Sequence, residues 1–360
     1  MTHVDGSDLM HPEWQAFLEA RGARFDDHDG EPCVAGFDDA GDPSGFELTD
    51  LSCFGQLRIE GPDAAKFFQG YATADVHAVS AEKAVASALC TREGRTIATF
   101  RLWGESDALS LRLHRALIVP VRDLLARYIV FSKAELVEPG DRIVGLGLVG
   151  EGAAEAVASV VGRAPEHGEV VRREGEHGER VALRNRGEVG RFELWLPRED
   201  APAIWDALAP QAHRVPFSRW LAHRIRAGYV DLSPRTAGEY VPQSLNLQAL
   251  GQIAFDKGCY LGQEVVARMQ YLGKVKKRLF RFSVEASAGA CPELGSPIRA
   301  GDPEGDEVGE VVAAAPDDGR CEMLAVVRVD RAEDALFVGR TPLRAEPLPY
   351  EVPPLREKAS

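Results

Sequence analysis

The sequence predicts an α+β protein of several domains that ends in a small antiparallel β-barrel. Its 360 residues exceed one ordinary hydrophobic core, and 45% of them are apolar, as in globular chains with a sizeable core. Helix and strand patterns are interspersed in the first three quarters of the chain, whereas short strands separated by Gly, Pro and Asp follow. We expect a loop-rich segment 1–45, a central region 46–273 with a break near residue 142, a barrel 274–350 and a tail 351–360.

The N-terminal segment is rich in Asp, Gly and Pro and contains one helical stretch near residues 13–21. We expect residues 28–44 to form a loop, because turn-forming residues dominate there. Residues 1–6 lack a basic region followed by an apolar run, so we expect no signal peptide.

In the central region, alternation of apolar and polar residues predicts strands, and apolar spacings of three and four predict helices. The predicted strands are residues 56–60, 85–89, 96–103, 109–113, 135–137, 143–148 and 192–196. The predicted helices are residues 62–68, 117–127, 153–161, 201–208 and 262–271. A mixed-charge stretch, residues 167–180, is interpreted as a solvated loop or hairpin.

After residue 274, strands are predicted at residues 279–284, 307–313 and 323–329, and turn residues separate them. This spacing is typical of a small antiparallel barrel. The tail 351–360 is polar, carries two prolines and is expected to be disordered.

Charge and cysteine content exclude several classes of protein. The net charge of −14 should repel nucleic acid and anionic membranes, and no apolar stretch approaches the 18 residues of a membrane span. The six cysteines form no Cys-x-x-Cys pair, which indicates a reducing cytoplasm and argues against a self-contained zinc or iron–sulfur site. We therefore expect no metal ligands.

The most informative stretch is Lys-Gly-Cys-Tyr-Leu-Gly-Gln-Glu at residues 257–264, which reads as a Gly-punctuated turn entering a helix. Cys259 would lie near the helix N-terminus and two residues from a lysine, and both features favour the thiolate. Glu264 precedes Arg268 by four residues, an order that stabilises a helix. The alternative is that Cys259 fills space as a small apolar side chain.

A basic cluster follows this stretch, and it stands out against the acidic composition of the chain. It indicates either an anion site, for example for ligand carboxylates, or a solvated strand edge. Its members are Lys274, Lys276, Lys277, Arg278 and Arg281.

A helix near residues 217–228 carries a core stripe at every fourth residue. Trp220 and Arg224 lie four residues apart on a neighbouring stripe. An aromatic ring beside a guanidinium could hold a flat heterocycle that bears a carboxylate. The alternative is a buried tryptophan with an arginine that reaches solvent.

Residues 241–251 and 257–268 resemble the signature of YgfZ-type proteins, whose diagnostic core reads Lys-Gly-Cys-Tyr-x-Gly-Gln-Glu. Residues 61–76, 90–95 and 128–133 resemble three further motifs of that family, and residues 224–228 resemble an Arg-containing helix end of its superfamily. The resemblance covers roughly residues 48–340.

This resemblance implies a fold like that of the glycine-cleavage T-protein: three domains in a ring around a central channel that binds tetrahydrofolate, the last a β-barrel. It implies a cytoplasmic accessory protein that supports assembly or repair of iron–sulfur enzymes in a folate-dependent way. Its expected partners are folate and iron–sulfur client or assembly proteins.

The resemblance also assigns candidate residues. Lys257 and Cys259 match the functional pair of the motif. Trp220 matches a folate-contacting aromatic, Phe54 stands where a relative carries a tryptophan, and Arg224 matches an arginine that binds substrate or folate. The other candidate folate-binding residues are Gln243, Asn246, Tyr260, Gln263, Glu264 and Arg268.

One difference separates this chain from true aminomethyltransferases, which carry an Asp-Asp pair four and five residues after the equivalent of Gly94. Here those positions are Ala98 and Thr99. Loss of a general acid–base carboxylate should reduce aminomethyl transfer by at least ~10²-fold. A rewired aminomethyltransferase or demethylase, and a non-catalytic interaction module, are the two alternatives to a folate-binding accessory protein.

Overall fold

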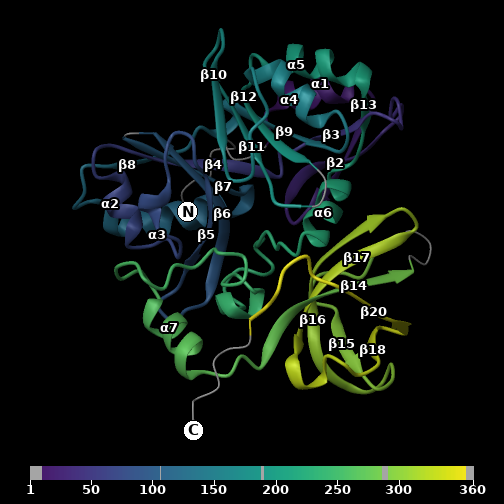
Figure 1. Cartoon of the computed structure of the whole chain (residues 1–360). Coiled ribbons are helices and arrows are strands. Elements are labelled where there is room, and N and C mark those ends of the chain that lie inside the picture. Colours follow the sequence, from purple (N-terminus) through teal and green to yellow (C-terminus); the bar gives the residue numbers. More distant parts are fainter. Residues whose placement is uncertain (1–9, 106, 188–189, 286–290, 354–360) are drawn as a thin grey trace, which may run out of the picture. The chain divides into compact units, whose positions relative to one another are not determined.

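The computed structural model describes residues 10–105, 107–187, 190–285 and 291–353 (Figure 1). Contacts divide the chain into two compact units, and each unit gathers segments that are distant in the sequence. Unit 1 comprises Met1–Phe68, Val76–Val85 and Phe100–Trp220, and unit 2 comprises Gln69–Asp75, Ala86–Thr99 and Leu221–Ser360. The domain boundaries expected from the sequence stay predictions.

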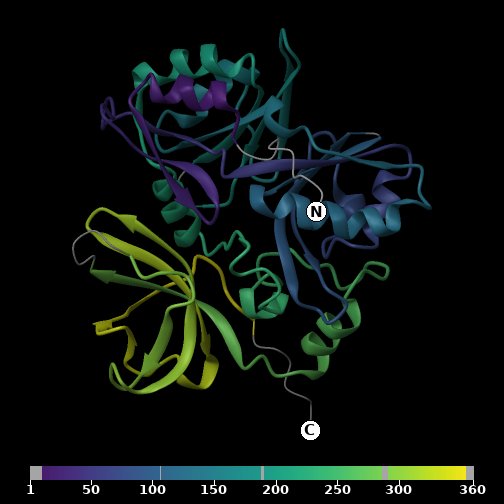
Figure 2. The same cartoon turned by 180° about the vertical axis from the view of Figure 1, so that it is seen from behind.

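Unit 1 contains a six-stranded sheet in the order β10-β11-β12-β9-β3-β13. These strands are Val170–Glu174, Glu179–Arg184, Arg191–Pro197, Ile143–Val149, Phe46–Asp50 and Ala212–Arg214. Helices α1 (Pro12–Glu19), α4 (Ala153–Val161) and α5 (Ala201–Leu208) cover one face of this sheet (Figure 2). Leu48, Leu146 and Leu194 project from that face into a core with Trp14 and Trp205.

A second sheet has the order β5-β6-β7-β4-β8. Its strands are Val85–Cys90, Thr96–Glu105, Ala108–His114, Phe54–Glu60 and Glu135–Val137. Helices α2 (Ala64–Gln69) and α3 (Ile118–Ile129) belong to this region, and α3 contacts β4. The boundary between the units runs through this sheet, because β6 begins in unit 2 and ends in unit 1.

A two-stranded hairpin formed by β1 (Ala23–His28) and β2 (Glu31–Phe37) precedes these sheets. The prediction of a loop over residues 28–44 is therefore wrong for residues 31–37, which form β2. Asp29 and Gly30 both have positive φ, 55° and 90°, as a type I′ hairpin turn requires. The Asp-Gly pair was the sequence signal for this hairpin.

Unit 2 contains a seven-stranded antiparallel sheet in the order β19-β18-β15-β16-β17-β14-β20, which confirms the predicted C-terminal barrel-like region. The strands are Thr341–Pro342, Leu336–Val338, Pro297–Ala300, Asp306–Asp317, Arg320–Arg328, Lys277–Glu285 and Arg344–Glu346. Strands β14 to β18 contribute to an apolar core that includes Phe282, Ile298 and Met323. The α+β class predicted from the sequence is thereby confirmed.

Two more helices complete the fold: α6 (Phe217–Arg226), which spans the boundary between the units, and α7 (Gln263–Leu272). Short 3₁₀ turns lie at Val76–Ala78, Arg115–Leu117, Gly140–Arg142, Ala209–Gln211, Pro242–Leu245 and Val329–Arg331. The hairpin interpretation of residues 167–180 is confirmed by β10 and β11. Most of the predicted tail, residues 354–360, lies outside the described residues.

Four of the six cysteines form disulfides, Cys33–Cys53 and Cys291–Cys321. The spacing of the cysteines did not reveal either pair, because the folded positions of the strands bring these residues together. Of the remaining two cysteines, Cys90 is buried and Cys259 is exposed.

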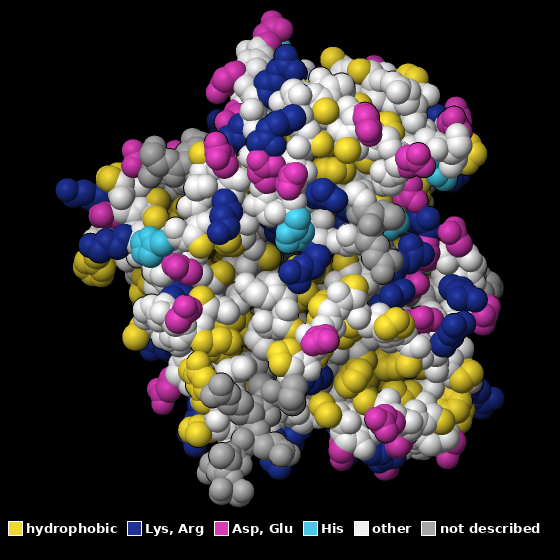
Figure 3. Space-filling view, viewed as in Figure 1, with side chains coloured by type: hydrophobic (Ala, Val, Ile, Leu, Met, Phe, Trp, Pro, Cys, Tyr) yellow, Lys and Arg dark blue, Asp and Glu magenta, His cyan; other side chains and the backbone are white. Residues whose placement is uncertain are grey.

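Acidic and basic side chains are interspersed over the face shown in Figure 3, so the net charge of −14 is spread out there rather than gathered. Within the described ranges, no helix is long and apolar enough to cross a membrane. The same residues contain no cluster of three His, Cys, Asp or Glu side chains arranged for a metal ion.

Candidate functional site

Unit 1 buries a layer of polar and aromatic side chains between its two sheets. Along β4, β7 and β12 these side chains occupy every second position, and the residues between them are apolar. We call this set the polar layer; it comprises Phe54, Gln56, Ser110, Arg112, His114, Asn185, Arg191, Glu193 and Trp195.

An ion pair between Arg112 of β7 and Glu193 of β12 joins the two sheets through this layer. Arg112 Nη2 lies 2.6 Å from Glu193 Oε1, and Arg112 Nε lies 3.1 Å from Oε2. Asn185 Nδ2 and Trp195 Nε1 donate to the same carboxylate at 3.0 and 3.1 Å. The side chains of the pair are 1% and 0% exposed, so removal of one partner should cost about 3–5 kcal/mol.

Of the two predicted folate-contacting aromatics, Phe54 belongs to this layer and Trp220 lies against it, and each is 1% exposed. The Arg112 guanidinium lies 4.4 Å from the centroid of the Phe54 ring. The Arg191 guanidinium lies 5.4 Å from the Trp220 ring, so Arg191 is the cation beside Trp220 in unit 1. Among described atoms, the Trp220 Nε1 has no hydrogen-bond partner.

Gly147 of β9 makes room for Trp220. A Cβ atom at this position would lie 2.7 Å from a Trp220 ring carbon and 2.9 Å from Thr49 Cγ2. Gly145 likewise makes room for Trp195, because a Cβ atom at residue 145 would lie 2.6 Å from the Trp195 ring. The Gly-x-Gly of this strand was the sequence signal for two packed indole rings.

A cavity of about 630 Å³ opens beside the polar layer within unit 1. Trp103, Trp195, Gln56 and Arg142 are among the residues that line it, as is His177. Phe54 and Trp220 are not among its described lining residues. The volume lies within the ~300–1,000 Å³ of small-molecule sites, and the lining combines indole faces with polar groups.

His177 lies between β10 and β11 and pairs with a buried carboxylate. Its Nδ1 lies 2.6 Å from Asp200 Oδ1, and Arg180 Nε donates to Asp200 Oδ2 at 2.8 Å. The hydrogen bond to Asp200 raises the pKa of His177. The cavity rim therefore carries a histidine that is protonated more readily than usual.

In unit 2, Lys257 serves as a structural clamp. Its Nζ donates to three backbone carbonyls, those of Gln69, Ala72 and Ala74, at 2.8, 2.7 and 2.8 Å. Three acceptors match the three hydrogens of an ammonium group. Burial lowers the pKa of Lys257 to about 8, and nearby Asp75 opposes that shift. The predicted lysine thus ties its own segment to residues 69–75.

Cys259 is exposed, and it stands four residues before α7, whose N-cap is Gly262. The hairpin between β5 and β6 packs against this N-terminus, because a Cβ on Gly262 would collide with the Thr91 carbonyl oxygen. On the other side, a Cβ on Gly94 would lie 2.9 Å from Val265. The motifs at residues 90–95 and 257–264 are therefore neighbours in unit 2.

Tyr260 points into this packed region. It is 6% exposed, burial raises its pKa, and its hydroxyl has no hydrogen-bond partner in the described part of the chain. A buried hydroxyl without a partner is rare in proteins. Tyr260 is therefore a group of the diagnostic motif that could still donate to a ligand.

The predicted arginine of α6, Arg224, forms a buried ion pair with Asp231 and lies 5.2 Å from the Tyr229 ring centroid. Gln243 Nε2 donates to Val266 O at 2.7 Å, and Asn246 Nδ2 donates to Leu279 O at 3.0 Å. Both amides are fully buried, and they connect the Pro242–Leu245 turn to α7 and β14.

The remaining predicted residues lie on α7. Gln263 is its first residue, and Glu264 and Arg268 are exposed. Both lie in α7, as their spacing of four residues requires, and their helix-stabilising effect stays a prediction.

Ala98 and Thr99, which stand where an acidic pair was considered, both have structural roles. Ala98 is fully buried. Thr99 Oγ1 donates to Val230 O at 3.1 Å and accepts the Leu232 amide at 3.1 Å. A threonine that bridges two backbone groups replaces a carboxylate at this position.

Arg112, Asn185, Arg191 and Glu193 were not expected from the sequence. For Arg112, Arg191 and Glu193 the available signal was a charged residue at alternate positions of a strand, residues 109–114 and 191–196. Such alternation usually indicates that the polar face is solvated, so the burial of this face follows from tertiary packing.

The family described as "GCVT N-terminal domain" matches residues 44–247. The tRNA-modifying protein YgfZ of Escherichia coli O127:H6 is 33% identical over 310 residues, 85% of this chain and 93% of the relative. The protein of the same name from Shigella dysenteriae serotype 1 is 33% identical over 311 residues, with the same coverage.

A solved structure, the glycine cleavage system aminomethyltransferase T from Bartonella henselae, matches with a TM-score of 0.74 at 15% identity. The match covers 94% of this chain and 97% of that one, so the two share a fold. From these similarities and its own motif, the chain belongs to the YgfZ family of proteins with the aminomethyltransferase fold.

Proposed function

We propose that this protein binds tetrahydrofolate and supports the assembly or repair of iron–sulfur enzymes in the cytoplasm, with Cys259 as its reactive group. The observation that carries the folate part is the buried polar layer with its adjoining cavity of about 630 Å³. A pterin is flat and has hydrogen-bonding edges, so it needs aromatic walls and fixed polar groups.

The residues of the cavity fit such a ligand. Trp103 and Trp195 supply aromatic faces, Gln56 supplies an amide, and Arg142 could meet a carboxylate of the folate tail. The Glu193 carboxylate behind Trp195 is held by four hydrogen bonds, so it keeps its orientation without a ligand. Tetrahydrofolate, when bound, supplies a reduced one-carbon carrier.

Cys259 carries the second part of the proposal, because it is exposed and belongs to the diagnostic motif. The Lys257 clamp fixes the segment from which its thiol projects. The relatives are named tRNA-modifying proteins. Since a chain with a net charge of −14 should bind tRNA weakly, we propose that any effect on tRNA passes through a client enzyme.

Folate binding can be tested by titrating the protein with tetrahydrofolate and following tryptophan fluorescence. We expect quenching that is largely lost in Trp103→Phe and Trp195→Phe but kept in Trp205→Phe, whose ring lies in the apolar core. Loss in Trp220→Phe instead would place the pterin beside Trp220 rather than in the cavity. No binding to the intact protein would refute the folate part.

The role of the thiol is tested in a deletion strain by assaying iron–sulfur enzymes. Cys259→Ser should keep the fold and folate binding but lose support of these enzymes. Full restoration by Cys259→Ser would show that the thiol is dispensable, and the motif would then be a structural turn. Cys90→Ser, which removes the buried unpaired cysteine, is the matched control.

A further inference from the structure

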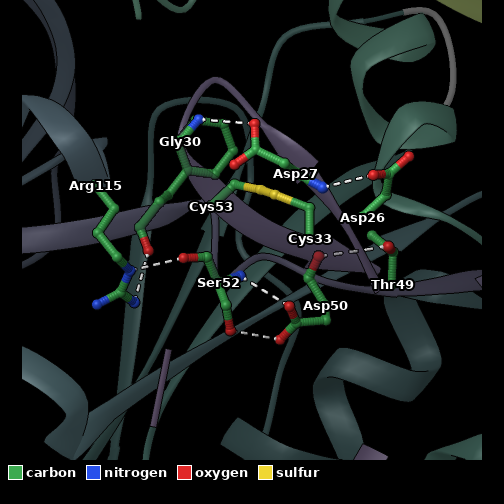
Figure 4. Close-up of a disulfide and its surroundings, with 10 residues drawn as sticks. Asp26, Asp27, Gly30, Cys33, Thr49, Asp50, Ser52, Cys53 and Arg115 are labelled. Carbon is green, nitrogen blue, oxygen red and sulfur yellow. Dashed lines mark hydrogen bonds between the residues drawn. A yellow bond between two sulfur atoms is a disulfide. The ribbon is translucent and has the colours of Figure 1, made fainter. Parts of the chain in front are cut away.

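The disulfide Cys33–Cys53 joins the β1–β2 hairpin of unit 1 to the turn before β4 (Figure 4). Cys33 lies in β2, and Cys53 lies in the turn directly before β4. Their Cα atoms are 5.9 Å apart, a usual separation for a disulfide, and 20 residues separate them in the sequence. The other disulfide lies in unit 2.

The Cys53 side is rigid. The buried Asp50 carboxylate accepts from Trp14 Nε1 at 2.8 Å and from the Ser52 amide and hydroxyl at 3.0 and 2.8 Å. Arg115 donates to the carbonyls of Ser52 and Phe54 at 2.7 and 3.1 Å, as Figure 4 shows for this turn. The turn is therefore fixed on both sides without the disulfide.

The Cys33 side belongs to a hairpin that joins no larger sheet. Strands β1 and β2 pair with each other in a two-stranded sheet, and such a hairpin is marginally stable alone. Val34 and Phe37 anchor its base in the apolar core, where Phe37 lies 5.8 Å from the Trp205 ring. Toward the tip, Asp26 and Asp27 are exposed, whereas Glu31 is buried and the His28 ring packs on other rings of unit 1.

The tip of this hairpin lies over the Phe54 end of the polar layer. The His28 ring centroid is 5.4 Å from that of Phe217 and 6.4 Å from that of His114. Phe217 in turn lies 5.6 Å from Phe54. A cross-link between the tip and the residue before Phe54 therefore holds a cover on this end of the candidate site.

We propose that Cys33–Cys53 is a reversible redox site, and that its disulfide latches the hairpin tip over the Phe54 end of the polar layer. The reductant is a cellular dithiol. One of its thiolates attacks a disulfide sulfur to form a mixed disulfide, and its second thiol displaces the protein sulfur. The dithiol is oxidised to a disulfide. Its two electrons and two protons pass to Cys33 and Cys53, which become thiols.

The burial of both sulfurs sets the order of events. Cys33 and Cys53 are 5% and 1% exposed, so the tip must open before a thiolate can reach them. Reduction then removes the cross-link, so the tip can open again. The turn around Cys53 stays in place, because it retains its own hydrogen bonds. That the hairpin tip controls access of a ligand rests on the proposed folate function. That the disulfide holds the hairpin tip does not depend on that function.

The latch is tested by hydrogen exchange of the amides of residues 24–33, with the protein either oxidised or reduced by dithiothreitol. Reduction should speed tip exchange by roughly 10- to 100-fold, within the range of a cross-link that closes a loop of this length. Cys33→Ser should exchange like the reduced protein with or without dithiothreitol. Cys291→Ser, which removes the other disulfide, should keep the difference.

Equal tip exchange in the two redox states, or no disulfide in the air-oxidised protein by thiol titration, would overturn the proposal. The comparison of oxidised and reduced wild type needs no variant, so it decides the matter even if Cys33→Ser misfolds. Stopped-flow mixing with tetrahydrofolate then tests access: association should be faster after reduction. An unchanged association rate would show that the hairpin tip does not cover the ligand site. No binding in either redox state would count against the folate proposal alone.

Discussion

Replacement of Lys257 by methionine tests whether this lysine is a clamp rather than a partner of the Cys259 thiol. Methionine keeps the length and apolar stem of the side chain but removes the ammonium. The carbonyls of Gln69, Ala72 and Ala74 then lose their donor. The expected result is a destabilised connection between residues 69–75 and the diagnostic motif.

The size of the expected loss in the free energy of unfolding follows from the contacts of Lys257. Hydrogen bonds to a charged group stabilise by about 1.5–3 kcal/mol each, and Lys257 makes three. Burial of the ammonium opposes this gain, as the lowering of the Lys257 pKa to about 8 indicates. We therefore expect Lys257→Met to lower the free energy of unfolding by about 2–3 kcal/mol, less than the three bonds would give alone.

Chemical denaturation followed by circular dichroism measures this loss. Lys274→Met is the matched control, because Lys274 is exposed and the same change there should stay within about 0.5 kcal/mol of wild type. If Lys257→Met were as stable as Lys274→Met, the three hydrogen bonds would contribute nothing. The clamp would then have to be abandoned.

Three other measurements follow from the structure. Limiting iodoacetamide near neutral pH should label Cys259 first, because it is exposed, whereas burial raises the pKa of Cys90 to about 12. Gly147→Ala should lower the free energy of unfolding by about 1–3 kcal/mol, because its Cβ would lie 2.7 Å from an indole ring. A reconstituted glycine-cleavage assay should show turnover at least ~10²-fold below that of a true aminomethyltransferase, since Ala98 replaces a carboxylate.

Each of these has a clear contrary result. Labelling of Cys90 before Cys259 would mean that the hairpin around Cys90 opens readily. For the glycine, Gly258→Ala is the control, because nothing lies within 4 Å of a Cβ there, and equal stability of the two variants would contradict the close packing. Robust glycine cleavage would favour a rewired aminomethyltransferase over the accessory protein proposed here.

Local sequence patterns were sufficient for most of the elements. Helices α4 and α5 and strand β8 have the predicted bounds, because their apolar spacing and flanking turn residues agree with the tertiary structure. The eight-residue motif at 257–264 was sufficient for the family, since its order rarely arises by chance. The hairpin β1–β2 was missed because its Asp-Gly turn lay in a tract that composition alone marked as a loop.

The contacts of individual side chains were decided by tertiary structure. Lys257 and Cys259 are two residues apart in the sequence, yet the lysine binds carbonyls about 185 residues away in the chain. Arg112 and Glu193 come from strands of different sheets, and 81 residues separate them. Sequence periodicity shows which face of an element a residue occupies, but the partner that lies opposite depends on how distant elements pack. By itself, the sequence therefore determined the family and the elements, whereas the clamp, the polar layer and the latch arise from packing between distant segments.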